Sequence, residues 1–232
     1  MKKIIKISLI LLLLGMAVIA AVLFLKEKRA ERKYENEFKN IQESVTEKKS
    51  DVNGLVKKNK DCIGYVEIPG TTISYPVMQT KDNPDFYLNH DFNRNYSFYG
   101  TPYLSAYCDV NKSDNLIIYG HNINGGKMFG ALEQYKDKEF FNKHRKIYFI
   151  TDKKREYEVF AVMSVNIHKF EYWKFVMARN KEEHDEFIDK VEEHSLWRQE
   201  NKPKYGEQML MLSTCDNGKG DDWRIVVIGG VQ

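Results

Sequence analysis

The sequence predicts a mainly β domain that follows an N-terminal membrane helix. From Cys62 onward, short segments rich in β-branched and aromatic residues alternate with Pro, Gly, Asn and Asp. These segments are residues 63–68, 72–77, 115–119, 146–151 and 157–165. Many short strands separated by turn residues are typical of a β-barrel or a β-sandwich. With 232 residues, of which 42% are hydrophobic, the chain can bury one core of ordinary size.

The membrane helix is predicted from an uncharged run at residues 7–25, which is long enough to span a bilayer. A cleaved signal peptide is the alternative, because the basic start fits both. The run is longer than the usual signal-peptide core, however, and no small-x-small cleavage site closes it. We therefore expect an uncleaved cytoplasmic tail and transmembrane anchor in residues 1–29.

The charges around this run bear on its orientation. Five basic residues follow it and outnumber the lysines before it: Lys26, Lys28, Arg29, Arg32 and Lys33. The positive-inside rule alone would place the C-terminal domain in the cytoplasm. Large C-terminal domains translocate largely regardless of charge, and the six-residue tail offers nothing to function inside. We expect a single-pass protein of the cell membrane with its N-terminus inside and its large domain on the extracellular face.

Residues 30–59 are predicted to form an N-terminal helical segment, because apolar residues recur there at helical spacing. They are Tyr34, Phe38, Ile41, Val45 and Val52. Asn53-Gly54 indicates a break, with Ser50 or Asp51 as the candidate cap of a short second helix. A helix that packs on the domain or spaces it from the membrane is favoured over a partner-binding coiled coil.

Residues 60–232 form the third part, the predicted β domain, which two helical segments interrupt. One is residues 128–135. The other starts at Asn180, where Glu183 three positions later resembles a capping box, and it carries Phe187, Ile188 and Val191 on one face.

The C-terminal stretch 209–230 carries the chemistry. Residues 208–214 and 224–228 are two short apolar segments joined by a Gly- and Asp-rich loop, which indicates a β-hairpin. Antiparallel pairing places Cys215 beside Arg224 at the edge of the sheet. A cation near a thiol favours the thiolate, and Arg keeps its charge and can bind a developing oxyanion. The alternative is a buried inert Cys and a solvated Arg.

His121 is the predicted base. It follows the apolar segment 115–120 and opens a glycine-containing loop, and catalytic residues favour such positions. His184 and His194 lie ten apart on a charged helix, which does not match zinc-ligand spacing. The sequence therefore predicts no metal site. Papain-like proteases run Cys then His, whereas here His121 comes first, and the caspase Cys pentapeptide is missing.

Several ordered segments together resemble the sortases, the membrane-anchored cysteine transpeptidases of Gram-positive bacteria, and in particular class B. They are residues 64–79 and 82–88, 117–122 with Tyr-Gly-His, Met128-Phe129 and 212–215 with Leu-Ser-Thr-Cys, followed by Arg224. One departure is Met211, which stands where the family commonly has Thr. The resemblance implies an eight-stranded β-barrel with N-terminal helices and a long helix inserted between late strands.

The resemblance also implies an activity and its partners. Cys215 would attack the Thr carbonyl of an Asn-Pro-x-Thr-Asn-like sorting motif near the C-terminus of a secreted protein. His121 would be the acid and base, and Arg224 would hold the oxyanion. An amine of peptidoglycan or of its lipid-linked precursor would resolve the thioacyl enzyme and anchor the protein to the cell wall. No metal or cofactor is implied.

Substrate contacts are also implied by the resemblance. Ser213, Asn83 and Leu88 would line the motif groove, and Tyr172 is a candidate wall; the alternative for Leu88 and Tyr172 is ordinary barrel core. The alternatives for function are a pilin-polymerising sortase that uses a Lys nucleophile and a non-catalytic membrane-tethered binding module.

The net charge and the two remaining cysteines bear on partners and on disulfide formation. The formal charge of +3 equals the contribution of Lys2, Lys3 and Lys6, so the rest of the chain is neutral in formal charge. No basic patch or aromatic-plus-basic platform stands out, and we expect no nucleic-acid partner. A disulfide between Cys62 and Cys108 is one alternative, and two buried free thiols are the favoured one.

Overall fold

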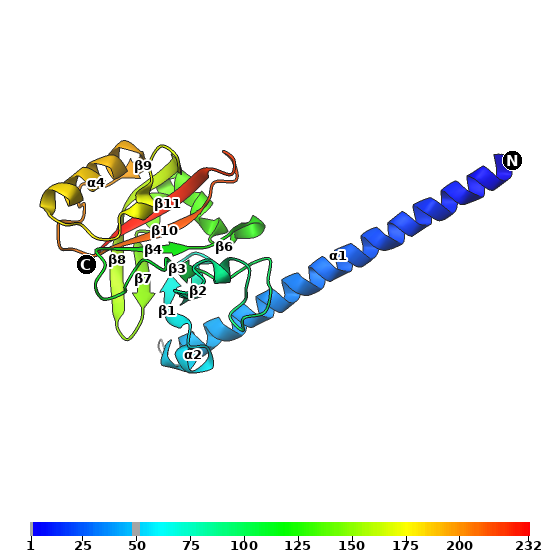
Figure 1. Ribbon diagram of the computed structural model, residues 1–232, viewed down its shortest axis with the longest axis horizontal. Coiled ribbons are helices and arrows are strands. Elements are labelled where there is room, and N and C mark those ends of the chain that lie inside the picture. The colour runs from blue at the N-terminus through cyan, green and yellow to red at the C-terminus, as the bar shows by residue number, and fades with distance from the viewer. Residues whose placement is uncertain (1, 48–51) are drawn as a thin grey trace. The chain divides into compact units, whose positions relative to one another are not determined.

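The computed structural model describes residues 2–47 and 52–232, and the chain divides into two compact units, Met1–Glu43 and Ser44–Gln232. Helix α1 (Lys2–Glu47) is a single helix (Figure 1). Its segment Ile4–Ile41 is long and apolar enough to cross a membrane. The apolar side chains at positions 4–25 are exposed, as is expected of a surface that faces lipid.

The second unit is a closed eight-stranded β-barrel. Its strands, in their order around the barrel, are β11 (Trp223–Val231), β10 (Met209–Cys215), β4 (Asn115–Tyr119), β3 (Tyr103–Leu104), β2 (Ser74–Met78), β1 (Cys62–Glu67), β7 (Lys146–Ile150) and β8 (Lys154–Asn166). Pairing of β11 with β8 closes the barrel, and β9 (Ser195–Arg198) pairs with β8 as a ninth strand. The predicted mainly β fold is confirmed.

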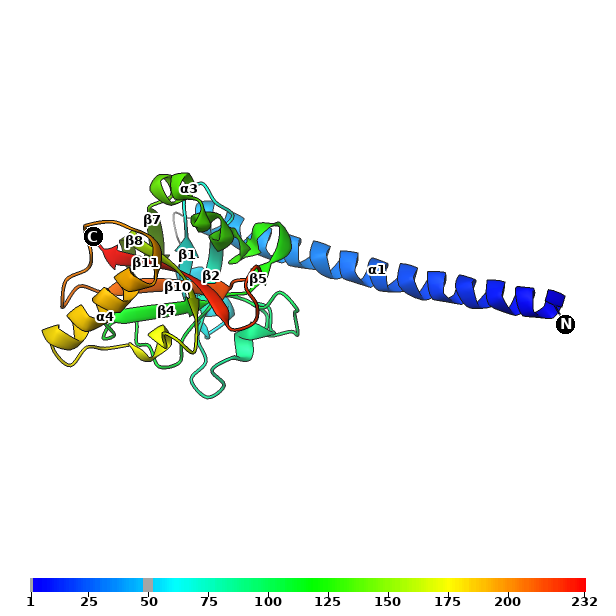
Figure 2. The same ribbon diagram turned by 90° about the horizontal axis from the view of Figure 1, so that it is seen from above.

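The strand directions are mixed. Strands β4 and β10 are far apart in the sequence but pair in parallel, with Tyr119 opposite Ser213, and they lie side by side in both views (Figures 1 and 2). Strand β10 also pairs antiparallel with β11, with Cys215 opposite Arg224. All but the last residue of β4 and of β10 are buried. This burial explains why both strands read as continuous apolar runs in the sequence.

The remaining elements occupy the connections between these strands. They are α2 (Val52–Lys58), η1 (Phe86–Leu88), β5 (Asn122–Ile123), η2 (Asn124–Gly126), β6 (Lys127–Met128), η3 (Gly130–Lys136), α3 (Lys138–Lys143), η4 (Tyr172–Lys174) and α4 (Lys181–Glu193). The helix expected at residues 128–135 is the 3-10 helix η3, which begins two residues later because Met128 pairs with Asn122 in the small β5–β6 sheet.

Helix α4 is the predicted long insertion, and it lies between β8 and β9 in the chain. The Asn180 side chain accepts a hydrogen bond from the Glu183 backbone N–H, so the predicted cap is confirmed. Phe187, Ile188 and Val191 are buried, as the apolar face predicted.

Cys62 and Cys108 are free, buried thiols. Each donates to a backbone carbonyl, Cys62 to Gly64 and Cys108 to Asn115. Burial raises the pKa of Cys62 to about 12, against a smaller opposing effect of the Gly64 contact. Burial also raises the pKa of Cys108. Both thiols are therefore protonated and unreactive at neutral pH, which agrees with the favoured alternative.

Candidate functional site

Three neighbouring strand ends bring His121, Cys215 and Arg224 together. Cys215 ends β10 and lies opposite Arg224 of β11. Because β4 and β10 are parallel with Tyr119 opposite Ser213, the residues two positions further on, His121 and Cys215, leave the same edge of the barrel at the same level.

Gly120, which joins the end of β4 to His121, is fixed by hydrogen bonds and close packing. The Gly120 N–H donates to the Ser213 carbonyl at 3.1 Å, and the Thr214 hydroxyl donates to the Gly120 carbonyl at 2.7 Å. A Cβ atom at Gly120 would lie 2.7 Å from the Phe129 ring, so this position requires glycine. Phe129 in turn donates its N–H to the His121 carbonyl. The backbone that carries His121 is therefore fixed against both β10 and the β6–η3 segment.

The three residues line one cleft of about 550 Å³. Its other lining residues are Pro84, Asp85, Leu88, Tyr103, Ser105, Ala106, Tyr107, Tyr119, Gly120, Trp173, Ser213 and Thr214. The cleft is mixed in character, with aromatic walls and polar groups near the thiol, and a short extended peptide fits its size and composition.

His121 is half-buried, and its Nε2 lies 2.8 Å from the Leu88 carbonyl oxygen. Because a carbonyl oxygen only accepts, this contact assigns a proton to Nε2 and leaves Nδ1 for proton transfer. Burial lowers the pKa of His121 below its usual 6.5, and the Leu88 contact opposes this shift. The imidazole is therefore mainly neutral at neutral pH.

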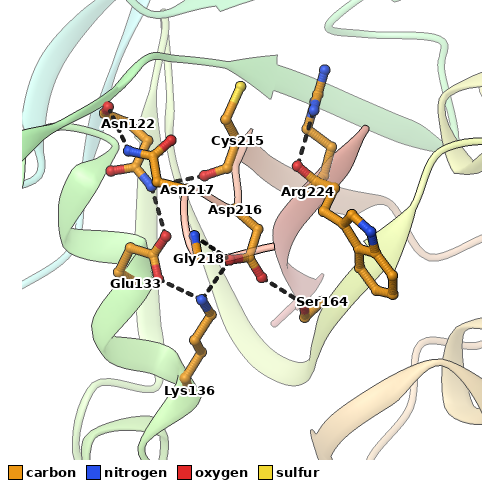
Figure 3. Close-up of polar contacts among 10 residues, drawn as sticks. Asn122, Glu133, Lys136, Ser164, Cys215, Asp216, Asn217, Gly218 and Arg224 are labelled. Atoms are coloured by element: carbon orange, nitrogen blue, oxygen red, sulfur yellow. Dashed lines mark hydrogen bonds and ion pairs between the residues drawn. The ribbon is translucent and has the colours of Figure 1, made fainter. Parts of the chain in front are cut away.

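Arg224 is fixed by the hairpin loop. One guanidinium nitrogen donates to the Asp221 carbonyl at 2.6 Å and to the Trp223 carbonyl at 2.9 Å. In Figure 3 the Cys215 thiol and the Arg224 guanidinium extend toward the same side. The other guanidinium nitrogens can donate hydrogen bonds to an oxyanion that forms near the sulfur.

The structure separates the four predicted substrate residues. Leu88 and Ser213 line the cleft. Tyr172 is fully buried and its hydroxyl lies 2.7 Å from that of Ser213, so it lies behind the wall rather than on it. Asn83 is exposed, does not line the cleft, and accepts from Thr80 and Phe86 through its carbonyl.

Sequence reasoning missed the polar residues beneath Cys215. The Asp216 carboxylate is fully buried and accepts from Lys136 and Ser164, each at 2.6 Å (Figure 3). Asp216 also accepts a hydrogen bond from the Gly218 N–H within the hairpin loop. Desolvation raises the pKa of Asp216, but the contacts with Lys136 and Ser164 outweigh it and lower the pKa overall. Within residues 2–47 and 52–232, no group of three His, Cys, Asp or Glu side chains is placed to hold a metal ion.

The chain is similar in sequence and in fold to known proteins. Residues 66–231 match the family model of the sortase domain. The chain is 32% identical to sortase B of Listeria monocytogenes over 187 residues, which cover 79% of this chain and 74% of the relative.

Solved structures extend the likeness to the fold. A substrate complex of Staphylococcus aureus sortase B has a TM-score of 0.79 and 26% identity over 87% of this chain and 97% of the relative. A sortase B structure complexed with triglycine has a TM-score of 0.78 and 26% identity over 87% and 98%. The chain therefore belongs to the sortase family of cysteine transpeptidases, and its relatives are class B sortases.

Proposed function

We propose that this protein cleaves a C-terminal sorting motif of secreted proteins after Thr and joins the new carboxyl end to an amine of the cell wall. The observation that carries the proposal is the meeting of Cys215, His121 and Arg224 at three adjacent strand ends, in a cleft that fits a short peptide. The motif we expect is Asn-Pro-x-Thr-Asn-like.

In the first step, the Cys215 sulfur attacks the Thr carbonyl carbon and the Thr–Asn peptide bond breaks. Nδ1 of His121 takes the proton of the Cys215 thiol and gives it to the leaving amine, and a thioester joins Thr to Cys215. Arg224 is held by two loop carbonyls beside the thiol, and its free N–H groups stabilise the negative charge on the Thr oxygen. Preorganised donors of this kind require little reorganisation during the reaction.

In the second step, the wall amine attacks the thioester carbon, His121 takes a proton from that amine, and the Cys215 sulfur leaves. The net reaction is transpeptidation, and water in place of the amine gives the hydrolysis of a cysteine peptidase. The triglycine complex of sortase B supports an amine-bearing peptide as acceptor. We infer that peptidoglycan or its lipid-linked precursor supplies this amine.

The substrate side of the cleft is assigned to Ser213 and Leu88, which line it. Tyr172 supports Ser213 from behind through the 2.7 Å hydroxyl contact. Asn83 lies outside the cleft wall, so no substrate contact is assigned to it. The S. aureus substrate complex supports a peptide in this cleft.

We also propose that residues 1–29 anchor the protein in the cell membrane with the N-terminus inside, that residues 30–59 follow as the helical segment, and that residues 60–232 act as the catalytic domain outside. The apolar surface of α1 supports the anchor. This arrangement places the cleft where secreted proteins and wall precursors meet.

The test is a panel of quenched sorting pentapeptides, assayed with and without triglycine or a pilin-like lysine peptide. We expect cleavage of an Asn-Pro-x-Thr-Asn-like member, a ligated product with triglycine, and loss of both in Cys215→Ala. Preference for the lysine peptide would indicate pilin polymerisation, and no cleavage of any member would favour the non-catalytic binding module.

A further inference from the structure

A ring of polar contacts lies beneath the cleft and involves the residue that follows each of two site residues. Asn122 follows His121, and Asp216 follows Cys215. On η3, Glu133 contacts the Asn122 side chain and Lys136 contacts the Asp216 side chain (Figure 3).

The first arm of the ring holds the backbone of the nucleophile. The Asn122 amide nitrogen donates to the Cys215 carbonyl and to the Glu133 carboxylate, each at 2.7 Å. These two contacts use both of its N–H groups. The Asn122 side chain can therefore form both bonds only while Cys215 and Glu133 keep their present spacing.

The second arm holds the side chain of Asp216. The Lys136 ammonium lies 2.6 Å from both Glu133 and Asp216, and the Ser164 hydroxyl donates to the other Asp216 oxygen at 2.6 Å. Asp216 is fully buried, whereas the side chains of Glu133 and Lys136 are about one third exposed. A buried carboxylate without its cation is costly, so Asp216 keeps its contact with Lys136.

The two arms close a circuit from Cys215 through Asn122, Glu133, Lys136 and Asp216 back to Cys215. The Asp216 carboxylate extends away from the Cys215 thiol (Figure 3), so it acts on the site through the backbone. We propose that this circuit is a positioning device that sets the distance between Cys215 and His121, with Asp216, Lys136, Glu133 and Asn122 as positioning residues. The proposal rests on the proposed function, because it names what aligns its nucleophile and its acid.

The first experiment measures peptide cleavage by the full chain in detergent with Asp216→Asn, Lys136→Met and the double variant. Misalignment lowers the rate of the chemical step, so we expect kcat to fall about 10- to 100-fold while KM stays within about twofold. Because both changes open the same circuit, the double variant should lose no more than the worse single variant.

Rescue and control variants separate positioning from a general loss of charge. Lys136→Arg keeps a cation between the two carboxylates and should recover most of kcat. Lys146→Met removes the exposed Lys146–Glu156 pair, which has the same 2.6 Å length on β7 and β8, and should leave kcat unchanged. Unchanged kcat in Lys136→Met, or losses that add in the double variant, would overturn the proposal.

A second readout needs no peptide, so it separates failure of this proposal from failure of the proposed function. The rate of Cys215 alkylation by iodoacetamide is measured against pH for the same variants. Asp216→Asn and Lys136→Met should each change the profile, and Lys146→Met should not. A changed profile supports the circuit even if no sorting peptide is cleaved, and profiles identical to that of the original chain would overturn it.

Discussion

At the scale of single residues, hydrogen bonds to backbone carbonyls fix the orientation of the side chains at the strand ends. His121 is held by the Leu88 carbonyl on one ring nitrogen, and Arg224 is held by the Asp221 and Trp223 carbonyls on one guanidinium nitrogen. In each case the backbone occupies one part of the side chain and leaves another part for the substrate. Under the proposed function, these local contacts preorganise the site before a peptide enters.

His121 should titrate below the usual histidine value. Burial lowers its pKa from 6.5, since the charged imidazolium loses hydration that the Leu88 contact only partly replaces. Because the pKa of His121 is lower in the folded protein than in the unfolded chain, the unfolded chain binds the proton more readily as pH falls below 6.5. Proton NMR of the imidazole, assigned with His121→Gln, should give a midpoint below 6.5. A midpoint at or above that value would contradict the burial argument.

Arg224 should not be replaceable by Lys. Arg224→Ala removes the proposed oxyanion donor, and kcat for peptide cleavage should fall about 10²- to 10³-fold. Arg224→Lys keeps the charge, but its single nitrogen cannot hold the loop carbonyls and the substrate together, so it should recover only a small part. Arg198→Lys is the matched control, because Arg198 also donates to a backbone carbonyl but lies on β9. Full activity of Arg224→Lys would contradict this role.

At the scale of elements, the site results from the pairing of three strands and from the side-chain contacts of one short helix. The parallel pairing of β4 with β10 and the antiparallel pairing of β10 with β11 set three strand ends at one edge. Helix η3 contacts this edge through two of its side chains, Glu133 and Lys136. Because loss of one partner would leave a buried charge, we expect the pair between Lys136 and Asp216 to stabilise the barrel as well as the site.

This stabilisation should be lost in acid. The folded pKa of Asp216 lies below its usual 3.8, so its contribution is complete above that value and disappears as pH falls through the folded pKa. At neutral pH, Asp216→Asn should lower the free energy of unfolding by about 1.5–3 kcal/mol, the range for hydrogen bonds to a charged group. Urea unfolding at neutral pH and below pH 3.8 should show this difference shrinking in acid. A difference that stays constant with pH would assign the loss to packing instead.

The elements also show what the sequence can predict. The strands β1, β2, β4, β7, β8, β10 and β11 follow from apolar and β-branched runs, and His121, Cys215 and Arg224 follow from their places at strand ends. The two-residue strand β3 is too short to leave a pattern, and the closure of the barrel came only from the family resemblance. Asp216 and Lys136 are 80 positions apart, and nothing local in the sequence shows that Asp216 is fully buried.

At the scale of the whole molecule, the chain combines an apolar helix with a barrel whose cleft opens at one edge. Membrane attachment would keep the cleft close to substrates that leave the cell. The chain divides into two compact units, Met1–Glu43 and Ser44–Gln232. The proposed boundary at residue 29 falls within the first of these units, and the one at residue 59 falls within the second.

The orientation in the membrane can be tested on intact cells. If the N-terminus is inside, a protease added to intact cells should degrade the barrel, and the same amount should spare a cytoplasmic marker. The full chain should also sediment with membranes, whereas a form that begins at residue 30 should not. Protection of the barrel in intact cells together with digestion after lysis would reverse the proposed topology.

The most direct measurement of the central claim is the mass of the enzyme during turnover. The full chain in detergent is incubated with an Asn-Pro-x-Thr-Asn-like peptide without an amine acceptor, and its intact mass is recorded. The account predicts an adduct equal to the peptide fragment that ends in Thr, located on Cys215, absent from Cys215→Ala and released by triglycine. Peptide cleavage without an adduct on Cys215, or cleavage that survives in Cys215→Ala, would contradict the account.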